Sequence, residues 1–122
     1  MVDFLFAGRI VNHMVEYNLD LIFKALSDPT RREILASLKA GDRTVGELAA
    51  PHAMSLAGAS KHIGVLENAG LVTRTRRGRE MHCSLRADSL RAAEAWLQSY
   101  ADLWNARFDR LDALLKAEKD HE

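Results

Sequence analysis

Cysteine, proline and long hydrophobic runs are scarce in this chain. Its single cysteine, Cys83, excludes an intramolecular disulfide, so a reducing, cytoplasmic location is expected. Two prolines, seven glycines and no low-complexity run in 122 residues exclude collagen-like, mucin-like and wholly disordered chains. No apolar run reaches the length of a membrane-spanning helix. Asp3 and Arg9 interrupt the apolar start, which argues against a signal peptide. The length and the 48% hydrophobic content indicate one globular domain with a core.

The formal net charge is zero, but the basic residues are unevenly placed. Residues 55–85 carry five Lys and Arg side chains against two Asp and Glu, whereas the segments before and after them are slightly acidic. A local basic excess on a neutral molecule is typical of a surface that meets phosphates. On charge alone, a solvated arginine-rich loop explains it equally well.

Two short helices are predicted before residue 42, and both are interpreted as scaffold. The second begins at Pro29, with Asp28 as its N-cap, and Gly41 suits a left-handed exit. The first has apolar residues at the i, i+3, i+4, i+7 spacing of one helix face, which are Leu19, Ile22, Phe23 and Leu26.

A helix-turn-helix is predicted next. Thr44 and Glu47 have the spacing of a capping box, and Pro51 ends this helix within about two turns. After a turn of four or five residues, Ser55 caps a second helix that runs to about Ala69, where Gly70 stops it. Two short helices joined in this way are typical of a helix-turn-helix.

The second helix of this pair is expected to have an apolar face and an opposite face with mostly small side chains. The apolar face holds Leu56, Ala59, Ile63 and Leu66. The other face holds Ala57, Ser60, Lys61, Gly64 and Asn68. The segment also contains Gly58, and a glycine inside a helix costs about 0.5 to 1 kcal/mol relative to alanine. Close approach of the helix to the floor of a DNA major groove explains that cost, because the groove admits one helix.

A basic β-hairpin is predicted after Gly70. Residues 71–76 are rich in β-branched side chains, and residues 80–85 follow across Arg77, Gly78 and Arg79. Such a tip would touch backbone phosphates or reach into a minor groove. The alternative is an exposed turn that arginine keeps soluble.

The last segment is predicted to form one long helix, from Asp88 or Ser89 to about Ala117. Thirty helical residues extend about 45 Å, so part of the apolar stripe is expected to pack against a second copy of the chain. The alternative is that the stripe folds back on its own core. The stripe consists of Leu90, Leu97, Trp104 and Leu111 with Ala93, Tyr100, Phe108 and Leu115 beside them.

Three stretches carry a family resemblance, namely residues 26–32 (LSDPTRR), 60–72 (SKHIGVLENAGLV) and 77–79 (RGR). They resemble the ArsR-type (arsenic-repressor-like) winged helix-turn-helix regulators of bacteria, over about residues 17–115. The resemblance implies a mainly α fold with four helices, a small β-hairpin wing and a fifth helix. It also implies a homodimer through the first and last helices that binds double-stranded operator DNA and usually represses transcription until a signal loosens it.

The resemblance also implies the site residues. Many family members have Gln and Pro where this chain has Leu56 and Ala57, so their base preference does not transfer. The expected DNA-binding residues are Ser55, Ala57, Gly58, Ser60, Lys61, His62, Arg74, Arg76, Arg77 and Arg79. The expected dimerisation residues are Leu19, Ile22, Leu97, Tyr100, Trp104, Phe108 and Leu111.

No cofactor or metal site is expected. Metal-sensing family members carry Cys-x-Cys in the first helix of the pair, or carboxylate and histidine ligands on the last helix. Here the matching stretch, residues 46–50 (GELAA), has no cysteine, and the last helix has no histidine before His121. The aromatic ending resembles a metal-independent branch, and Cys83 is interpreted as packing. A metal- or redox-responsive repressor of the same fold is the alternative.

Two other function classes fit the sequence less well than a transcription regulator. An enzyme is disfavoured because the chain has no Gly-rich phosphate loop, nucleophile elbow or close His and carboxylate set. A winged-helix module that binds a protein instead of DNA would use the aromatic last helix. Residues 14–118 are expected to form the domain, with 119–122 as a tail. Residues 1–13 are either an arm across the dimer or the result of a start assigned too early.

Overall fold

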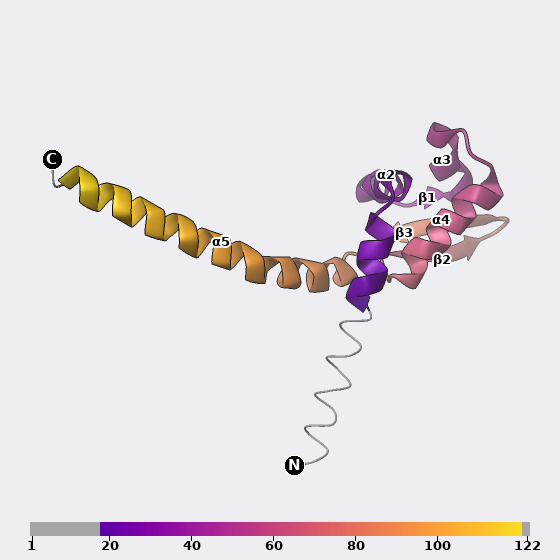
Figure 1. Cartoon of the computed structure of the whole chain (residues 1–122). Helices are drawn as coiled ribbons and strands as arrows, with labels where there is room; N and C mark the ends of the chain where they lie inside the picture. Colours follow the sequence, from indigo (N-terminus) through magenta and orange to yellow (C-terminus); the bar gives the residue numbers. More distant parts are fainter. Residues whose placement is uncertain (1–17, 121–122) are drawn as a thin grey trace, which may run out of the picture. The chain divides into compact units, whose positions relative to one another are not determined.

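The computed structural model describes residues 18–120, so the predicted N-terminal extension and residues 14–17 lie outside the described residues. The chain divides into two compact units, Met1–Ala92 and Ala93–Glu122. In the described part of the first unit, residues 18–26 are helical and are followed by α2 (Pro29–Ser37), η1 (Leu38–Ala40), β1 (Arg43–Thr44) and α3 (Val45–Ala49). Then come η2 (Ala50–His52), α4 (Leu56–Asn68), β2 (Val72–Arg77) and β3 (Glu80–Leu85). Finally α5 (Asp88–Asp120) runs from the first unit into the second (Figure 1).

The caps predicted from the sequence are confirmed. Asp28 caps α2 by accepting from the backbone N–H groups of Thr30 and Arg31. Thr44 and Glu47 form both bonds of a capping box, each 3.1 Å long. The hydrogen bonds from Thr44 lower the pKa of Glu47. Because a cap uses groups within four residues of one another, its pattern is visible in the sequence.

The end of α4 is also determined by groups that are close together in the sequence. Gly70 has a φ of +73°, and its N–H donates to the carbonyl of Glu67, while Leu71 donates to Leu66. These two bonds are those of a Schellman motif, which needs a left-handed residue at this place. A Cβ on Gly70 would also lie 2.5 Å from the Ser89 hydroxyl oxygen, so space as well as φ requires glycine here.

The sheet has three strands in the order β1-β3-β2, all antiparallel. The hairpin of β2 and β3 was predicted, and its turn is shorter than expected because Arg77 already pairs with Glu80. Gly78, with a φ of +65°, occupies this tight turn. The two-residue β1 was missed, since its pairing of Arg43 with Cys83 joins residues far apart in the sequence.

The core of the first unit collects side chains from every layer. Fully buried large side chains come from the first helix, α2, α4, the strands and the link between α4 and β2, and they are Ile22, Ile34, Ile63, Leu66, Leu71, Val72 and Cys83. Burial raises the pKa of the Cys83 thiol, which disfavours the reactive thiolate. The prediction that Cys83 is a packing residue is thus confirmed.

Candidate nucleic-acid interface

The helix-turn-helix places α4 on the surface of the first unit. α3 packs against the start of α4, and the strand β2 lies beside α4 (Figure 1). Ala53, with a φ of +50°, turns the chain between η2 and α4. Ser55 then caps α4 by accepting from the Gly58 N–H at 3.0 Å. The first N–H groups of a helix have no partner within the helix and can bind an anion.

The outer face of α4 is close to the predicted one. Ala57, Lys61 and Asn68 are exposed, and Ser60 and Gly64 are half-buried. Within residues 18–120, Lys61 has no hydrogen bond or ion pair, so its ammonium group is available to a ligand. His62 lies on a different side, where its Nδ1 is 3.4 Å from Nη1 of Arg31.

The predicted inner face of α4 needs one correction. Ala59, Ile63 and Leu66 are fully buried, but Leu56 is 63% exposed. Leu56 is the first residue of the helix, and its Cδ2 is 3.8 Å from where a Cβ on Gly46 would stand. A helical wheel assigns it to the core, yet no element within residues 18–120 covers it at the helix start.

The two glycines inside α4 have different surroundings. A Cβ on Gly58 would lie 3.3 Å from the capping hydroxyl of Ser55, which is a tight contact. A Cβ on Gly64 would lie 3.5 Å from Nη2 of Arg74, which is an ordinary van der Waals contact. A contact within the chain therefore disfavours a side chain at Gly58 but not at Gly64.

The four arginines of the wing have different surroundings. Arg74 donates to the hydroxyl of Ser60 at 2.7 Å and to Oε1 of Glu67 at 3.1 Å. Arg76 donates to the Gly78 carbonyl, and Arg77 pairs with Asp42 at 3.3 Å. Arg79 is exposed and has no partner within the described residues.

Arg77 keeps its charge available despite this pair. Its side chain is 60% exposed, and exposed ion pairs contribute little, about 0 to 1 kcal/mol. A phosphate could therefore replace Asp42. Arg74 differs, because all three nitrogens of its guanidinium group are already hydrogen-bonded to α4.

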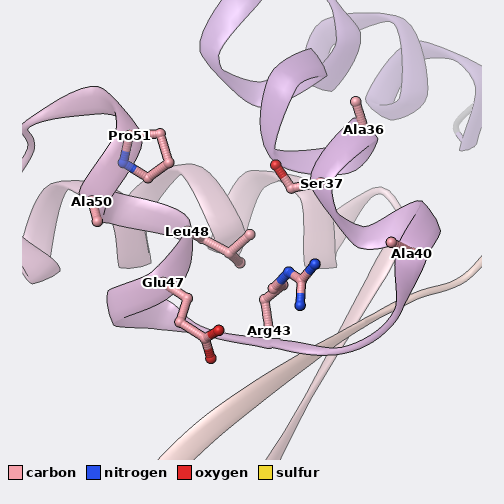
Figure 2. A pocket seen from close by; sticks show the side chains of 8 residues that line it. All are labelled: Ala36, Ser37, Ala40, Arg43, Glu47, Leu48, Ala50 and Pro51. Atoms are coloured by element: carbon pink, nitrogen blue, oxygen red, sulfur yellow. The ribbon is translucent and has the colours of Figure 1, made fainter.

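A groove of about 530 Å³ runs between α4, the wing and the start of α3. Its lining includes Leu56, Ala57, Ser60, Arg74, Arg79 and Met81. Four of these six were predicted to bind DNA, so the structure brings helix and wing candidates to one surface. A second hollow, of about 570 Å³, lies between the end of α2 and α3, where Figure 2 shows Arg43 and Glu47 opposite Ser37 and Ala36. None of the predicted DNA-binding residues lines it.

The predicted dimerisation residues separate into two groups. Ile22 is fully buried and Leu19 is 9% exposed, so both are covered within one chain instead of forming a free surface. In the second unit, Ala93 is buried, but the apolar stripe of α5 is exposed from Leu97 onward, including Leu97, Tyr100, Trp104, Phe108 and Leu111. Trp104 and Phe108 make an edge-to-face ring contact with centroids 4.8 Å apart. This stripe is the exposed apolar surface that a second chain could cover.

Among residues 18–120, no cluster of three or more His, Cys, Asp or Glu side chains could hold a metal ion. In the same range, no helix combines the length and the apolar character needed to cross a membrane.

Comparison with known proteins gives the family. Residues 26–75 match a family model described as a helix-turn-helix domain. The transcriptional repressor SdpR of Bacillus subtilis is 37% identical over 79 residues, which cover 65% of this chain and 88% of SdpR. A crystal structure of an ArsR family transcriptional regulator is 41% identical with a TM-score of 0.69, covering 74% of this chain and 93% of that one.

A solved relative is described as a dimer. It is the homodimeric winged helix-turn-helix DNA-binding domain of a possible ArsR-family regulator from Mycobacterium bovis. It is 27% identical, has a TM-score of 0.61, and covers 75% of this chain and 84% of that one. The fold, the extent of these matches and the helix-turn-helix geometry all indicate the same family. The chain belongs to the ArsR family of winged helix-turn-helix, DNA-binding transcriptional regulators, a family of regulators and not of enzymes.

Proposed function

We propose that this chain is a homodimeric repressor that binds an inverted-repeat operator with α4 and the wing of each copy. The observation that carries the proposal is the groove that brings Ala57 and Ser60 of α4 together with Arg79 of the wing. Lys61 follows Ser60 on α4 and is exposed, and within residues 18–120 neither Lys61 nor Arg79 has a hydrogen bond or ion pair. Lys61 would reach base edges, and Arg76, Arg77 and Arg79 would hold phosphates. Two-fold symmetry would place the half-site centres about 34 Å apart, one turn of DNA.

Repression and dimer formation are carried over from relatives. SdpR is named a transcriptional repressor, and the Mycobacterium bovis domain is described as homodimeric. The exposed stripe on α5 supports a dimer in this chain, because a helix that keeps so much apolar surface in water usually has a partner.

The direct test uses fluorescence anisotropy with labelled duplexes over a series of salt concentrations. The promoter region next to the gene should bind much more tightly than random duplex, with a steep salt dependence. Equal absence of binding to both duplexes at low salt would contradict the proposal. It would favour a protein-binding module that uses α5.

Arg79→Ala is expected to weaken binding to every duplex and to flatten the salt dependence. Removal of one phosphate contact per subunit lowers the slope of log K against log salt by about 0.9 per contact. Lys119→Ala, which removes an exposed cation from the last turn of α5, is the matched control. If both variants changed the slope equally, a contact by Arg79 would be contradicted.

The proposed signal is not a metal ion. The matching stretch of the helix pair, residues 46–50, contains no thiolate, and α5 contains no histidine. Zn²⁺, Cd²⁺ or arsenite added to the protein–DNA complex is therefore expected to leave its affinity unchanged. Release of the duplex at micromolar metal, reversed by a chelator, would contradict this part of the proposal.

A further inference from the structure

Arg74 forms a bridge between the wing and α4. It is the third residue of β2, and its side chain lies along α4 with only 21% exposed. Nη1 donates to the hydroxyl of Ser60 at 2.7 Å, while Nε and Nη2 donate to Oε1 of Glu67 at 3.3 and 3.1 Å. Gly64 lies between these two residues of α4, and a Cβ there would lie 3.5 Å from Nη2 of Arg74, so the guanidinium group packs directly over this position.

The charge of Arg74 is therefore already used within the chain. Its three nitrogens are committed to α4, and Glu67 supplies the opposite charge. Nε and Nη2 share one carboxylate oxygen of Glu67 and Nη1 bonds to Ser60, so three of the five N–H groups of Arg74 are used within the chain. A phosphate that drew Arg74 away from α4 would break these charge-assisted hydrogen bonds, which are stronger than neutral ones. Arg76, Arg77 and Arg79 are the cations of the wing that remain for the DNA backbone.

The hydrogen bond from Arg74 also determines whether the Ser60 hydroxyl acts as a donor or an acceptor toward a ligand. A serine hydroxyl has one proton to donate and two lone pairs that accept. Arg74 occupies a lone pair, and within residues 18–120 the hydroxyl proton has no acceptor. The cation also polarises the O–H bond, which makes the hydroxyl a better donor. Ser60 thus presents a donor at the surface where α4 meets its ligand.

We propose that Arg74 is a positioning residue that fixes the wing against α4 and makes Ser60 a hydrogen-bond donor to a DNA base. The acceptors of matching chemistry in the major groove are purine N7, guanine O6 and thymine O4. This inference rests on the proposed function, because it requires α4 to lie in the groove. It replaces the prediction that Arg74 itself binds DNA.

The test compares Arg74→Lys, Ser60→Ala and the double variant on the tightest duplex selected from a random pool by the wild-type protein. Lysine keeps the charge but cannot span Ser60 and Glu67 as the guanidinium fork does. Arg74→Lys and Ser60→Ala should each weaken binding about tenfold, the scale of one lost hydrogen bond. Both should relax the preference at the same base pair and leave the salt slope unchanged, and the double variant should bind no more weakly than Ser60→Ala.

Three results would overturn this inference. Near-normal binding by Arg74→Lys, together with a lower salt slope for Arg74→Gln, would show that Arg74 holds a phosphate. Equal losses on all sequences, with a lower midpoint of thermal unfolding, would show a purely structural role. A Ser60→Ala variant that relaxes no base pair would remove the proposed donor.

If the proposed function itself were wrong, the wild-type protein would select no duplex. That result differs from a failure of the inference on Arg74, in which the wild-type protein still selects a duplex. Arg74→Gln also serves as the second variant if Arg74→Lys unfolds, since it keeps an amide donor and removes the charge. The inference predicts an unchanged salt slope for this variant too.

Discussion

Trp104→Glu is expected to convert the proposed dimer into monomers and to weaken operator binding about 100-fold or more. Trp104 lies in the middle of the apolar stripe of α5 and is 59% exposed in the single chain. A buried carboxylate without a partner is strongly unfavourable, so the second copy would dissociate. Each monomer would then bind one half-site. The 10²- to 10⁴-fold gain in affinity that comes from linking two binding sites would be lost.

Ala106→Glu is the matched control for this substitution. Position 106 lies on the opposite face of α5 and is exposed, so the same charge should stay in water there. Light scattering measures the mass of both variants, and fluorescence anisotropy measures their affinity for the operator. A Trp104→Glu variant that stays dimeric would show that the stripe is not the interface.

Lys61→Ala is expected to have the second largest effect, a loss of about tenfold or more in operator affinity together with a relaxed preference at one base pair of each half-site. A side chain that reads a base edge contributes about 1 to 3 kcal/mol of discrimination. Lys61 is exposed on the outer face of α4 and is free of partners in the described residues, so nothing within the chain competes for it.

A library of operators randomised at each position measures both parts of this result. Lys39→Ala, which removes an exposed lysine from η1, should leave the affinities unchanged. Uniform loss across the library would mean that Lys61 contacts only the backbone, and the base-reading role would then be wrong.

Most of the first unit was predictable because its signals are local. The caps at Asp28, Thr44 and Ser55 and the stop at Gly70 each depend on groups a few residues apart. The faces of α4 follow from helical periodicity, apart from Leu56, which the helix start leaves uncovered. Local chemistry therefore predicts where elements begin, end and turn.

The features that the sequence did not predict depend on contacts between residues far apart in the chain. β1 exists because Arg43 and Thr44 pair with β3, and two residues have no periodicity to reveal a strand. The proximity of Arg74 to Gly64, 3.5 Å from where a Cβ would stand, joins residues ten apart and was not visible in the sequence. The sequence also shows four arginines on the wing, without showing that one is paired to α4.

The arrangement of charges explains why a neutral chain can belong to a DNA-binding family. Glu67 neutralises Arg74 and Asp42 pairs with Arg77, while Lys61 and Arg79 have no acidic partner in the described residues. A few correctly placed cations suffice to position a duplex, while hydrogen-bond donors on α4 supply sequence preference. Net charge alone is therefore a poor guide to this function.

Selection of bound duplexes from a random pool shows whether two symmetric copies of α4 bind one operator. We expect an enriched inverted repeat whose half-site centres are about ten base pairs apart, because two symmetric copies would present α4 to successive major grooves. Enrichment of a single site without two-fold symmetry, by protein shown to be dimeric in the same buffer, would contradict it.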